Sequence, residues 1–152
     1  MKFLLSIIIL SLTLSNCGFT PIYSSKNSNF EIIDIINNNE NKNSFFIEKT
    51  LMSLSNKDAL KKVKIELDFK QSYTTILKDS KGDPSKKKLL IEVDLIVKNK
   101  DNDVLTNKTF NEEFSYDVQS DKFKMSQYEE NITINLNNKI SNDIIFLLGT
   151  LE

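Results

Sequence analysis

The chain has 152 residues, a net charge of −1, 39% hydrophobic residues and no histidine. Ten phenylalanines and this hydrophobic content indicate a globular domain, and the near-zero net charge argues against nucleic acid as a partner. The lack of histidine excludes a Ser-His-Asp triad, a Cys-His dyad and a histidine-ligated metal.

Other catalytic arrangements find little support in the sequence. The three glycines do not form a phosphate-binding loop. The acidic pairs Glu112-Glu113 and Glu129-Glu130 consist of adjacent residues, a pattern typical of solvated faces. We therefore expect a protein that is not an enzyme and that holds no metal and no organic cofactor. Every basic residue is a lysine, so any anion would meet point charges on flexible side chains.

The first elements in chain order are a charge, Lys2, and an apolar run from Leu4 to Leu14. As a helix this run would rise about 16 Å, which is too short to span a bilayer but suits the apolar region of a signal peptide. The run leads to Cys17, the single cysteine of the chain. With Leu14 and Ser15 before the cysteine, the segment resembles a bacterial lipoprotein signal, which ends at a cysteine that receives lipid.

This resemblance divides the chain into parts. We expect residues 1–16 to be the signal peptide and residues 17–29 to be an acylated N-terminus and tether. Cys17 would carry the lipid, and Gly18, which is not acidic, favours delivery to the outer membrane. The alternative is an ordinary secreted protein with a free thiol, which would be a liability in an oxidising compartment.

The next segments predict a strand and a helix. The apolar run from Phe30 to Ile36 favours a strand, followed by a turn at residues 37–39. A helix is expected from Ser44 to Asn56, with Asn43 or Ser44 as its N-cap. Its buried stripe would be formed by Ile47, Leu51 and Leu54.

Two segments then alternate strictly between apolar and polar residues, over 63–70 and 89–98. A period of two with one apolar face predicts an antiparallel sheet that is covered on one side. The loop between them is expected to contain residues 81–84 and the lysine run 86–88. The uncovered face would carry charged side chains: Lys64, Glu66, Asp68, Lys70, Glu92, Asp94 and Lys98.

A turn at residues 99–103 leads to a further strand over 104–118. The turn superficially resembles a calcium loop, but it lacks the required glycine, and Phe110 stands where the bidentate glutamate would be needed. We therefore interpret it as a hairpin turn. The even-numbered face of the following strand would present Phe110, Phe114, Tyr116 and Val118.

The last element is predicted to be a long helix. Ser126 and Glu129 have the spacing of a capping box, and Gly149 can end the helix as a C-cap. A helix lying on a membrane is the alternative, but the polar face is rich in asparagine and glutamate rather than lysine, which favours a core helix. Its apolar stripe comprises Tyr128, Ile132, Leu136, Ile140, Ile144, Leu147 and Leu148.

Together these elements predict an α+β, two-layer sandwich. Two helices would pack on one face of a four-stranded, mainly antiparallel sheet, in the order β-α-β-β-β-α. Residues 30–152 would form this single domain.

The residues from Cys17 to Tyr23 read Cys-Gly-Phe-Thr-Pro-Ile-Tyr, which resembles the mature N-terminus of the LPS-assembly lipoprotein family, LptE. Phe114 to Val118 resembles that family's segment before its last helix, and the predicted element order is also similar. The resemblance implies a protein that plugs the lumen of the LptD outer-membrane β-barrel. It also implies a role in barrel assembly and in inserting lipopolysaccharide, with membrane attachment through Cys17.

Lysines expected near loop tips are the candidates for contacting lipopolysaccharide phosphates. Neutralising Lys86, Lys87 and Lys88 together is expected to weaken this binding. The alternative is that these lysines solubilise a hairpin tip or protect a sheet edge. A periplasmic lipoprotein that binds a small ligand or a cell-wall component, or a purely structural envelope lipoprotein, would also fit the composition. The candidate residues are Lys78, Lys81, Lys86, Lys87 and Lys88, with Lys122 and Lys124 as a second group.

Overall fold

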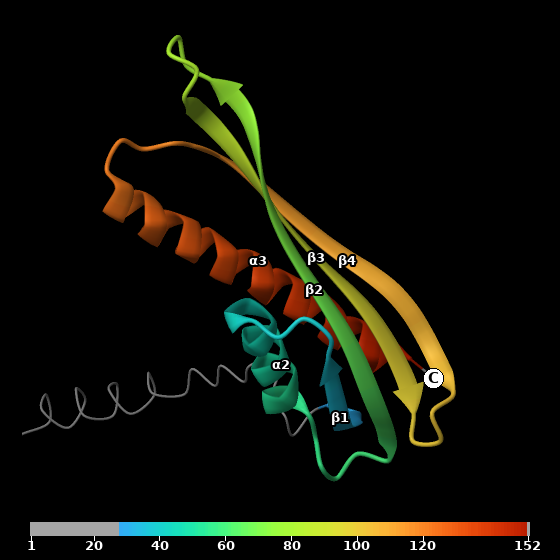
Figure 1. Cartoon of the computed structure of the whole chain (residues 1–152). Helices are drawn as coiled ribbons and strands as arrows, with labels where there is room; N and C mark the ends of the chain where they lie inside the picture. Colours follow the sequence, from blue (N-terminus) through green and yellow to red (C-terminus); the bar gives the residue numbers. More distant parts are fainter. Residues whose placement is uncertain (1–27, 152) are drawn as a thin grey trace, which may run out of the picture.

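The computed structural model of the chain describes residues 28–151 (Figure 1). The predicted signal peptide, Cys17 and nearly all of the predicted tether therefore lie outside the described residues. The described elements are β1 (Phe30–Asn37), α2 (Lys42–Leu54), β2 (Lys61–Lys78), β3 (Pro84–Asn99), β4 (Val104–Asp117) and α3 (Lys122–Thr150).

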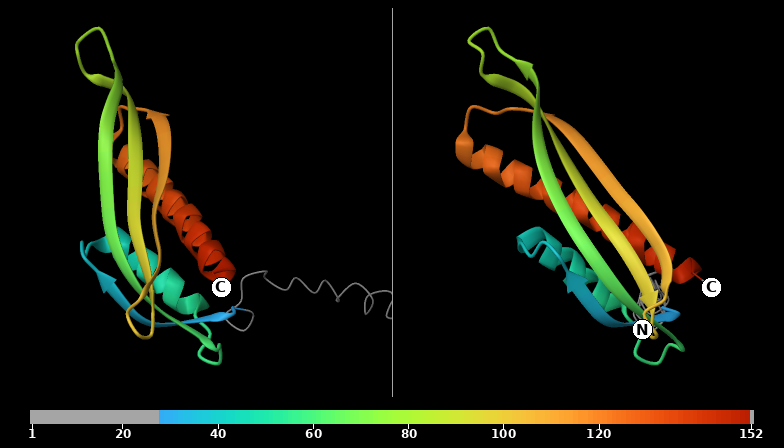
Figure 2. Two further views of the ribbon diagram at one scale, coloured as in Figure 1. Left: turned by 90° about the vertical axis from the view of Figure 1, so that its right-hand side faces the viewer. Right: turned by 45° about the vertical axis from the view of Figure 1, so that its right-hand side comes forward.

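The four strands form one sheet in the order β1-β2-β3-β4. β1 runs parallel to β2, whereas β2, β3 and β4 are antiparallel neighbours. Both helices lie on one side of this sheet (Figure 2). The α+β class, the element order and the mainly antiparallel sheet predicted from the sequence are confirmed.

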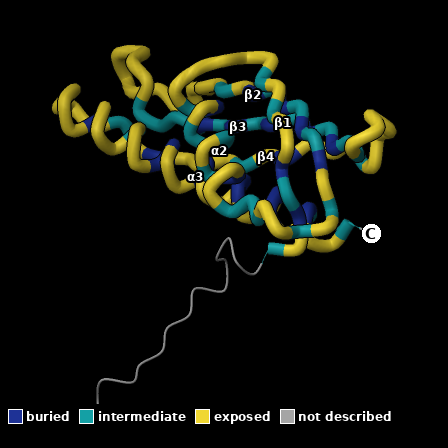
Figure 3. Tube along the Cα trace, turned by 90° about the horizontal axis from the view of Figure 1, so that it is seen from below, coloured by how far each residue is buried: buried dark blue, intermediate teal, exposed yellow. Residues whose placement is uncertain are grey.

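The core lies between the helices and one face of the sheet. Residues 63–69 and 89–97 alternate between buried and partly exposed positions, and this alternation follows the strands in Figure 3. The predicted helix stripes meet this face, because Ile47, Leu51, Ile140 and Ile144 are all buried. Each fully buried aliphatic side chain of this kind contributes about 1.5–3 kcal/mol through its removal from water.

The first helix begins and ends two residues earlier than predicted. Asn41 is the N-cap, and its Oδ1 accepts hydrogen bonds from the backbone N–H groups of Asn43 (2.9 Å) and Ser44 (3.0 Å). The Asn41 N–H in turn donates to Ser44 Oγ at 2.9 Å, so the two residues form a reciprocal capping box. The predicted caps at Asn43 and Ser44 were wrong because a better-placed asparagine precedes them.

The final helix is longer than predicted at both ends. Asp121 is its N-cap and accepts from the N–H groups of Phe123 (3.0 Å) and Lys124 (3.1 Å). The predicted capping box at Ser126 is therefore wrong, since Ser126 lies inside the helix. Gly149 also lies inside the helix, which ends with Leu151 as its C-cap, so the predicted glycine C-cap is wrong as well.

The hairpin of β2 and β3 is much longer than the apolar alternation indicated. Its connecting turn comprises only residues 79–83, because the polar stretches on both sides continue the strand pairing up to Lys78 and Pro84. The prediction that residues 84 and 86–88 belong to the loop was therefore wrong. Asp79 Oδ1 organises the turn by accepting from the N–H groups of Lys81 and Asp83, each at 2.9 Å.

The turn between β3 and β4 is a hairpin turn, as predicted. Asn99 Oδ1 accepts from the N–H groups of Asp101 and Asp103, and Asn102 takes a left-handed φ of 72°. In β4 the predicted inward face is only partly buried. Phe110 and Tyr116 are buried, but Phe114 keeps 43% of its surface exposed.

Candidate functional site

The described residues contain neither a metal centre nor a membrane-crossing helix. Within residues 28–151, histidine, cysteine, aspartate and glutamate side chains do not gather in threes or more around a point that could hold a metal. The helices of this part are also too polar or too short to cross a membrane. The described domain presents two ends, a polar sheet face and a space between its helices.

The candidate lysines lie at one end of the molecule, opposite to the described C-terminus. In Figure 1 the β2–β3 hairpin extends past the N-terminal end of α3, where the chain enters that helix. We call this region the lysine end. It comprises Lys78, Lys81, Lys86, Lys87, Lys88, Lys122 and Lys124.

Strand geometry separates the run Lys86-Lys87-Lys88. Successive side chains of a strand point to opposite faces, so Lys87 lies on the helix side while Lys86 and Lys88 lie on the open side. Lys87 forms an ion pair with Glu129 of α3 at 3.7 Å. Lys88 pairs with Glu113 of β4 at 2.9 Å. The three lysines thus do not form one cluster, contrary to their adjacency in the sequence.

The remaining candidate lysines differ in whether an acidic side chain lies within ion-pair distance. Lys124 lies 4.0 Å from the capping carboxylate of Asp121. The described residues provide no ion pair within 4.0 Å for Lys78, Lys81, Lys86 and Lys122. Those four lysines are therefore the members of the lysine end that are best placed to meet an external anion.

Glu129 connects three elements at the base of this end. The hydroxyl of Tyr116 in β4 donates a hydrogen bond to Glu129 Oε1 at 2.6 Å. The same oxygen forms the ion pair with Lys87 of β3. Burial and then the Glu129 carboxylate raise the pKa of Tyr116 above its usual range. The Tyr116 ring also meets Tyr128 edge-on, with 6.0 Å between ring centroids. Sequence reasoning gave Glu129 a capping role because its position in the fold was unknown.

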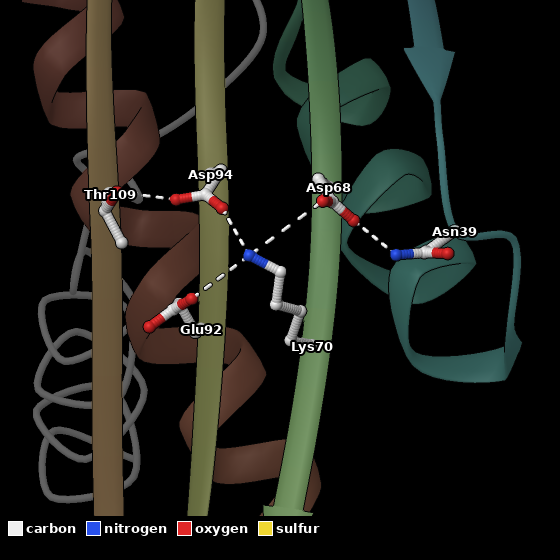
Figure 4. A network of polar contacts seen from close by, with 6 residues as sticks. All are labelled: Asn39, Asp68, Lys70, Glu92, Asp94 and Thr109. Atoms are coloured by element: carbon white, nitrogen blue, oxygen red, sulfur yellow. Dashed lines mark hydrogen bonds and ion pairs between the residues drawn. The ribbon is translucent and has the colours of Figure 1, made fainter.

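The open face of the sheet carries the charged side chains predicted for it. Lys70 is its centre, with its Nζ 2.7 Å from Asp94, 3.3 Å from Glu92 and 3.9 Å from Asp68 (Figure 4). The hydrogen bond from Lys70, followed by one from Thr109, lowers the pKa of Asp94.

Further contacts extend this polar face towards both edges. Asn39 donates to Asp68, and Lys98 pairs with Glu66 at 2.5 Å. Lys64 donates to the Asn102 side chain at 2.7 Å. The face is therefore hydrated and charged with both signs, and each exposed pair is worth at most about 1 kcal/mol.

A groove of about 590 Å³ opens between α2, α3 and the upper part of β2. Its walls include Phe45 of α2, Tyr73 of β2 and Ile134 of α3, whose exposed fractions are 62%, 48% and 38%. The Lys42–Glu130 ion pair, at 2.5 Å, bridges the two helices at its rim. We call this space the α2–α3 groove.

The lining of the α2–α3 groove includes a buried amide. Asn137 of α3 is only 1% exposed, and its Oδ1 has no hydrogen-bond partner among the described residues. The sequence gave a weak signal for this residue. Asn137 directly follows Leu136, a member of the apolar stripe of α3, so its position adjoins the core.

The comparisons with known proteins concern the fold. Neither the protein-family models nor the curated protein sequences match this chain. Solved structures do match. An uncharacterized lipoprotein B from Nitrosomonas europaea has a TM-score of 0.65 at 11% identity, covering 87% of this chain and 90% of that chain.

Two further lipoproteins are similar to a comparable extent. Rare lipoprotein B from Shewanella oneidensis gives a TM-score of 0.58 at 12% identity, covering 77% of this chain and 91% of its own. A minor lipoprotein from Acinetobacter baumannii gives 0.59 at 8% identity, with 78% and 90% covered. The chain thus has the fold of several bacterial lipoproteins, over nearly their whole solved length.

Proposed function

We propose that this protein is an outer-membrane lipoprotein that plugs the lumen of the LptD β-barrel. In this role it would assist assembly of the barrel and insertion of lipopolysaccharide into the outer leaflet. Acylation at Cys17 would attach it to the membrane on the periplasmic side. The protein would perform no chemistry of its own and would act by occupying space within its partner.

One combination of observations carries this proposal. A fold found in several bacterial lipoproteins occurs here in a chain whose residues from Cys17 to Tyr23 resemble the mature N-terminus of the LptE family. The fold match at 8–12% identity is independent of that short motif. Each would be weak support alone, and both favour the same family.

The open face of the sheet is compatible with a water-filled lumen. Its charges are paired within the face, as Lys70 is with Asp94 and Lys98 is with Glu66. A surface of this kind stays hydrated against a polar wall and does not require an apolar partner. It would suit plain solvent equally well, so it supports the proposal without distinguishing it from other roles.

The lysine end supplies the proposed contact with lipopolysaccharide. Lys78, Lys81 and Lys86 lie on or near the projecting hairpin and have no described ion pair. Each would donate charge-assisted hydrogen bonds to phosphate oxygens. Lys87 and Lys88 are proposed as minor contributors, because each is already paired with a glutamate.

Affinity purification tests the proposal. The full chain, tagged at its C-terminus and expressed in its own host, would be extracted in a mild detergent, and its partners would be identified by mass spectrometry. We expect the LptD barrel in stoichiometric amount and a fatty-acylated Cys17 on the mature chain. Recovery of the lipoprotein alone would contradict the plug role, and recovery without fatty acid would contradict the anchor.

A second candidate function is favoured by the α2–α3 groove. A volume of about 590 Å³ whose lining combines aromatic and aliphatic side chains with polar ones, among them a buried amide with an unpaired oxygen, has the character of a small-ligand site. In that case the protein would be a periplasmic lipoprotein that carries a small molecule or a cell-wall component. Such a protein would come away from detergent extracts without a barrel, so the same experiment separates the two functions.

A further inference from the structure

The upper half of β2 has an edge that the described strands leave open. β3 pairs with β2 from Val63 to Lys78, with register shifts between Thr75 and Lys78, but β1 pairs with β2 only as far as Leu67. Beyond that point, Asn39 contacts Asp68 through side chains, and Asn43 Nδ2 donates to Gln71 Oε1 at 2.7 Å. From residue 72 to residue 78 no described strand pairs with this edge.

An unpaired strand edge is a template for another strand. Residues 72–78 extend over about 23 Å, and the outward N–H and C=O groups of the regular part, residues 72–75, can pair with an extended polypeptide. Natural proteins protect such edges with charges, prolines or bulges, and here the register shifts between Thr75 and Lys78 interrupt only the part of the edge near the hairpin tip. Residues 72–77, Ser-Tyr-Thr-Thr-Ile-Leu, contain neither charges nor prolines, and the residue types are those that favour strands.

The α2–α3 groove adjoins this open edge. Gln71 and Tyr73 of β2 belong to the lining of the groove, together with Phe45 and Ile134 from the two helices. Alternate side chains of a strand added to the edge would point to the helix side of the sheet, into the groove. Asn137, buried in the groove lining with an unpaired Oδ1, offers a hydrogen bond to a backbone or side-chain donor that enters.

We propose that an extended peptide segment of a partner protein binds here. The segment pairs with residues 72–78 of β2 as an added strand and places apolar side chains between Phe45 and Ile134. The open edge decides between a peptide and a lipid, because an acyl chain has no groups that match alternating N–H and C=O positions. The hollow beside the other sheet edge, β4, is bordered by Lys108 and Phe146 and is smaller, at about 330 Å³.

The proposal predicts both where a peptide binds and what sequence it has. The acylated full-length protein in mild detergent would be immobilised and screened with a displayed library of random peptides about ten residues long. Enriched peptides should alternate apolar and polar residues and lack central prolines. An enriched peptide should slow hydrogen exchange of the amides in residues 72–78 at least about tenfold and leave β4 unchanged.

Matched variants test whether the peptide binds in the α2–α3 groove. Phe45→Glu and Ile134→Glu should each weaken binding of the enriched peptide by about tenfold or more, and Phe45→Leu should largely retain it. Phe123→Glu is the control, since Phe123 is 70% exposed on α3 and lies outside the groove lining. A copy of the peptide with two adjacent N-methylated central residues should not bind, because both of its edges are blocked.

Each other outcome overturns the proposal. These outcomes are failure to enrich any peptide, protection confined to β4, and binding that is unaffected by Phe45→Glu and Ile134→Glu. Slow exchange of residues 72–78 in the free protein at high concentration would instead identify a second copy as the occupant. The inference does not depend on the barrel proposal, because the barrel can co-purify whether or not the peptide binds.

Discussion

At the scale of single residues, Glu129 links three elements. Its carboxylate accepts the Tyr116 hydroxyl at 2.6 Å and pairs with Lys87, so it joins β4 and β3 to α3. Tyr116→Phe keeps the ring packing and removes only the donor. We expect it to lower the free energy of unfolding by about 1–2 kcal/mol, measured by urea denaturation, because a hydrogen bond to a charged group is lost. An unchanged midpoint would show that this bond does not stabilise the fold.

Tyr116 also predicts a dependence on alkaline pH. Burial raises the pKa of Tyr116 in the folded state, so folding favours the neutral phenol. Its stabilising contribution is complete below the unfolded tyrosine pKa of about 10 and is lost as the pH rises above that value. Urea titrations at increasing pH should therefore show a smaller loss for Tyr116→Phe than for the wild type. Equal losses would assign the alkaline destabilisation to other groups.

The two possible caps of α3 can be separated by single substitutions. Asp121→Ala removes the oxygen that accepts from the N–H groups of Phe123 and Lys124, and it should cost about 1 kcal/mol of stability. Ser126→Ala, inside the helix, should change stability by less than about 0.5 kcal/mol. Thermal denaturation of both variants checks this, and the reverse order would restore the cap predicted from the sequence.

At the scale of elements, α3 packs against the core through one of its faces. Ile140 is fully buried, whereas Ile134 keeps 38% of its surface exposed. Ile140→Ala should cost about 2–5 kcal/mol because it leaves a cavity in the core, and Ile134→Ala should cost much less. Chemical denaturation of the pair measures the difference. Similar costs would indicate that the helix packs in another orientation.

The lysine end requires a binding experiment on the purified, acylated protein. Replacing Lys78, Lys81 and Lys86 with glutamine should weaken lipopolysaccharide binding about tenfold at low salt, a free-energy change of about 1.4 kcal/mol. The double variant of Lys87 and Lys88 should have a smaller effect, because both lysines are paired with glutamates.

The control for this experiment removes equal charge at the other end of the molecule. Lys57, Lys62 and Lys100 lie at or near the start of β2 and in the β3–β4 turn, far along the strands from the hairpin tip. Their replacement with glutamine should leave binding unchanged. An equal effect of both triple variants would mean that binding reflects overall charge, and no effect of either would remove the lysine end as a binding site.

The strands also show how much of the fold the sequence pattern predicts. Alternation over residues 63–70 and 89–98 predicted the sheet, its single apolar face and the charged residues opposite, all of which the structure confirms. The same criterion failed at residues 71–78 and 84–88, where the strands are not buried in the core and apolar and polar residues do not alternate. Strand pairing there is supported by the backbone ladder with β3 and not by burial, so no periodic signal marks it.

The candidate sites were predicted less completely for a similar reason. Lysines could be found by residue type, but their division between two faces depended on knowing that residues 86–88 belong to a strand. The α2–α3 groove joins residues from α2, β2 and α3 that are far apart in the chain. Only the tertiary arrangement brings Phe45, Tyr73 and Asn137 together, and no spacing in the sequence encodes that proximity.

At the scale of the whole molecule, the proposal is that the LptD barrel encloses this domain. A plug inside a barrel is surrounded, so both the open face of the sheet and the outward side of α3 should lie close to the barrel wall. A periplasmic binding protein attached only by lipid has no such surroundings. Exposed positions on the two sides are Asn107 on β4 and Asn142 on α3.

Photo-crosslinking from these two positions in living cells is the most direct measurement. A photoreactive amino acid would replace Asn107 in one strain and Asn142 in another, and the adducts would be identified by mass spectrometry. The account predicts LptD adducts from both positions. Adducts from only one position, or from neither, would contradict the claim that the barrel encloses this domain.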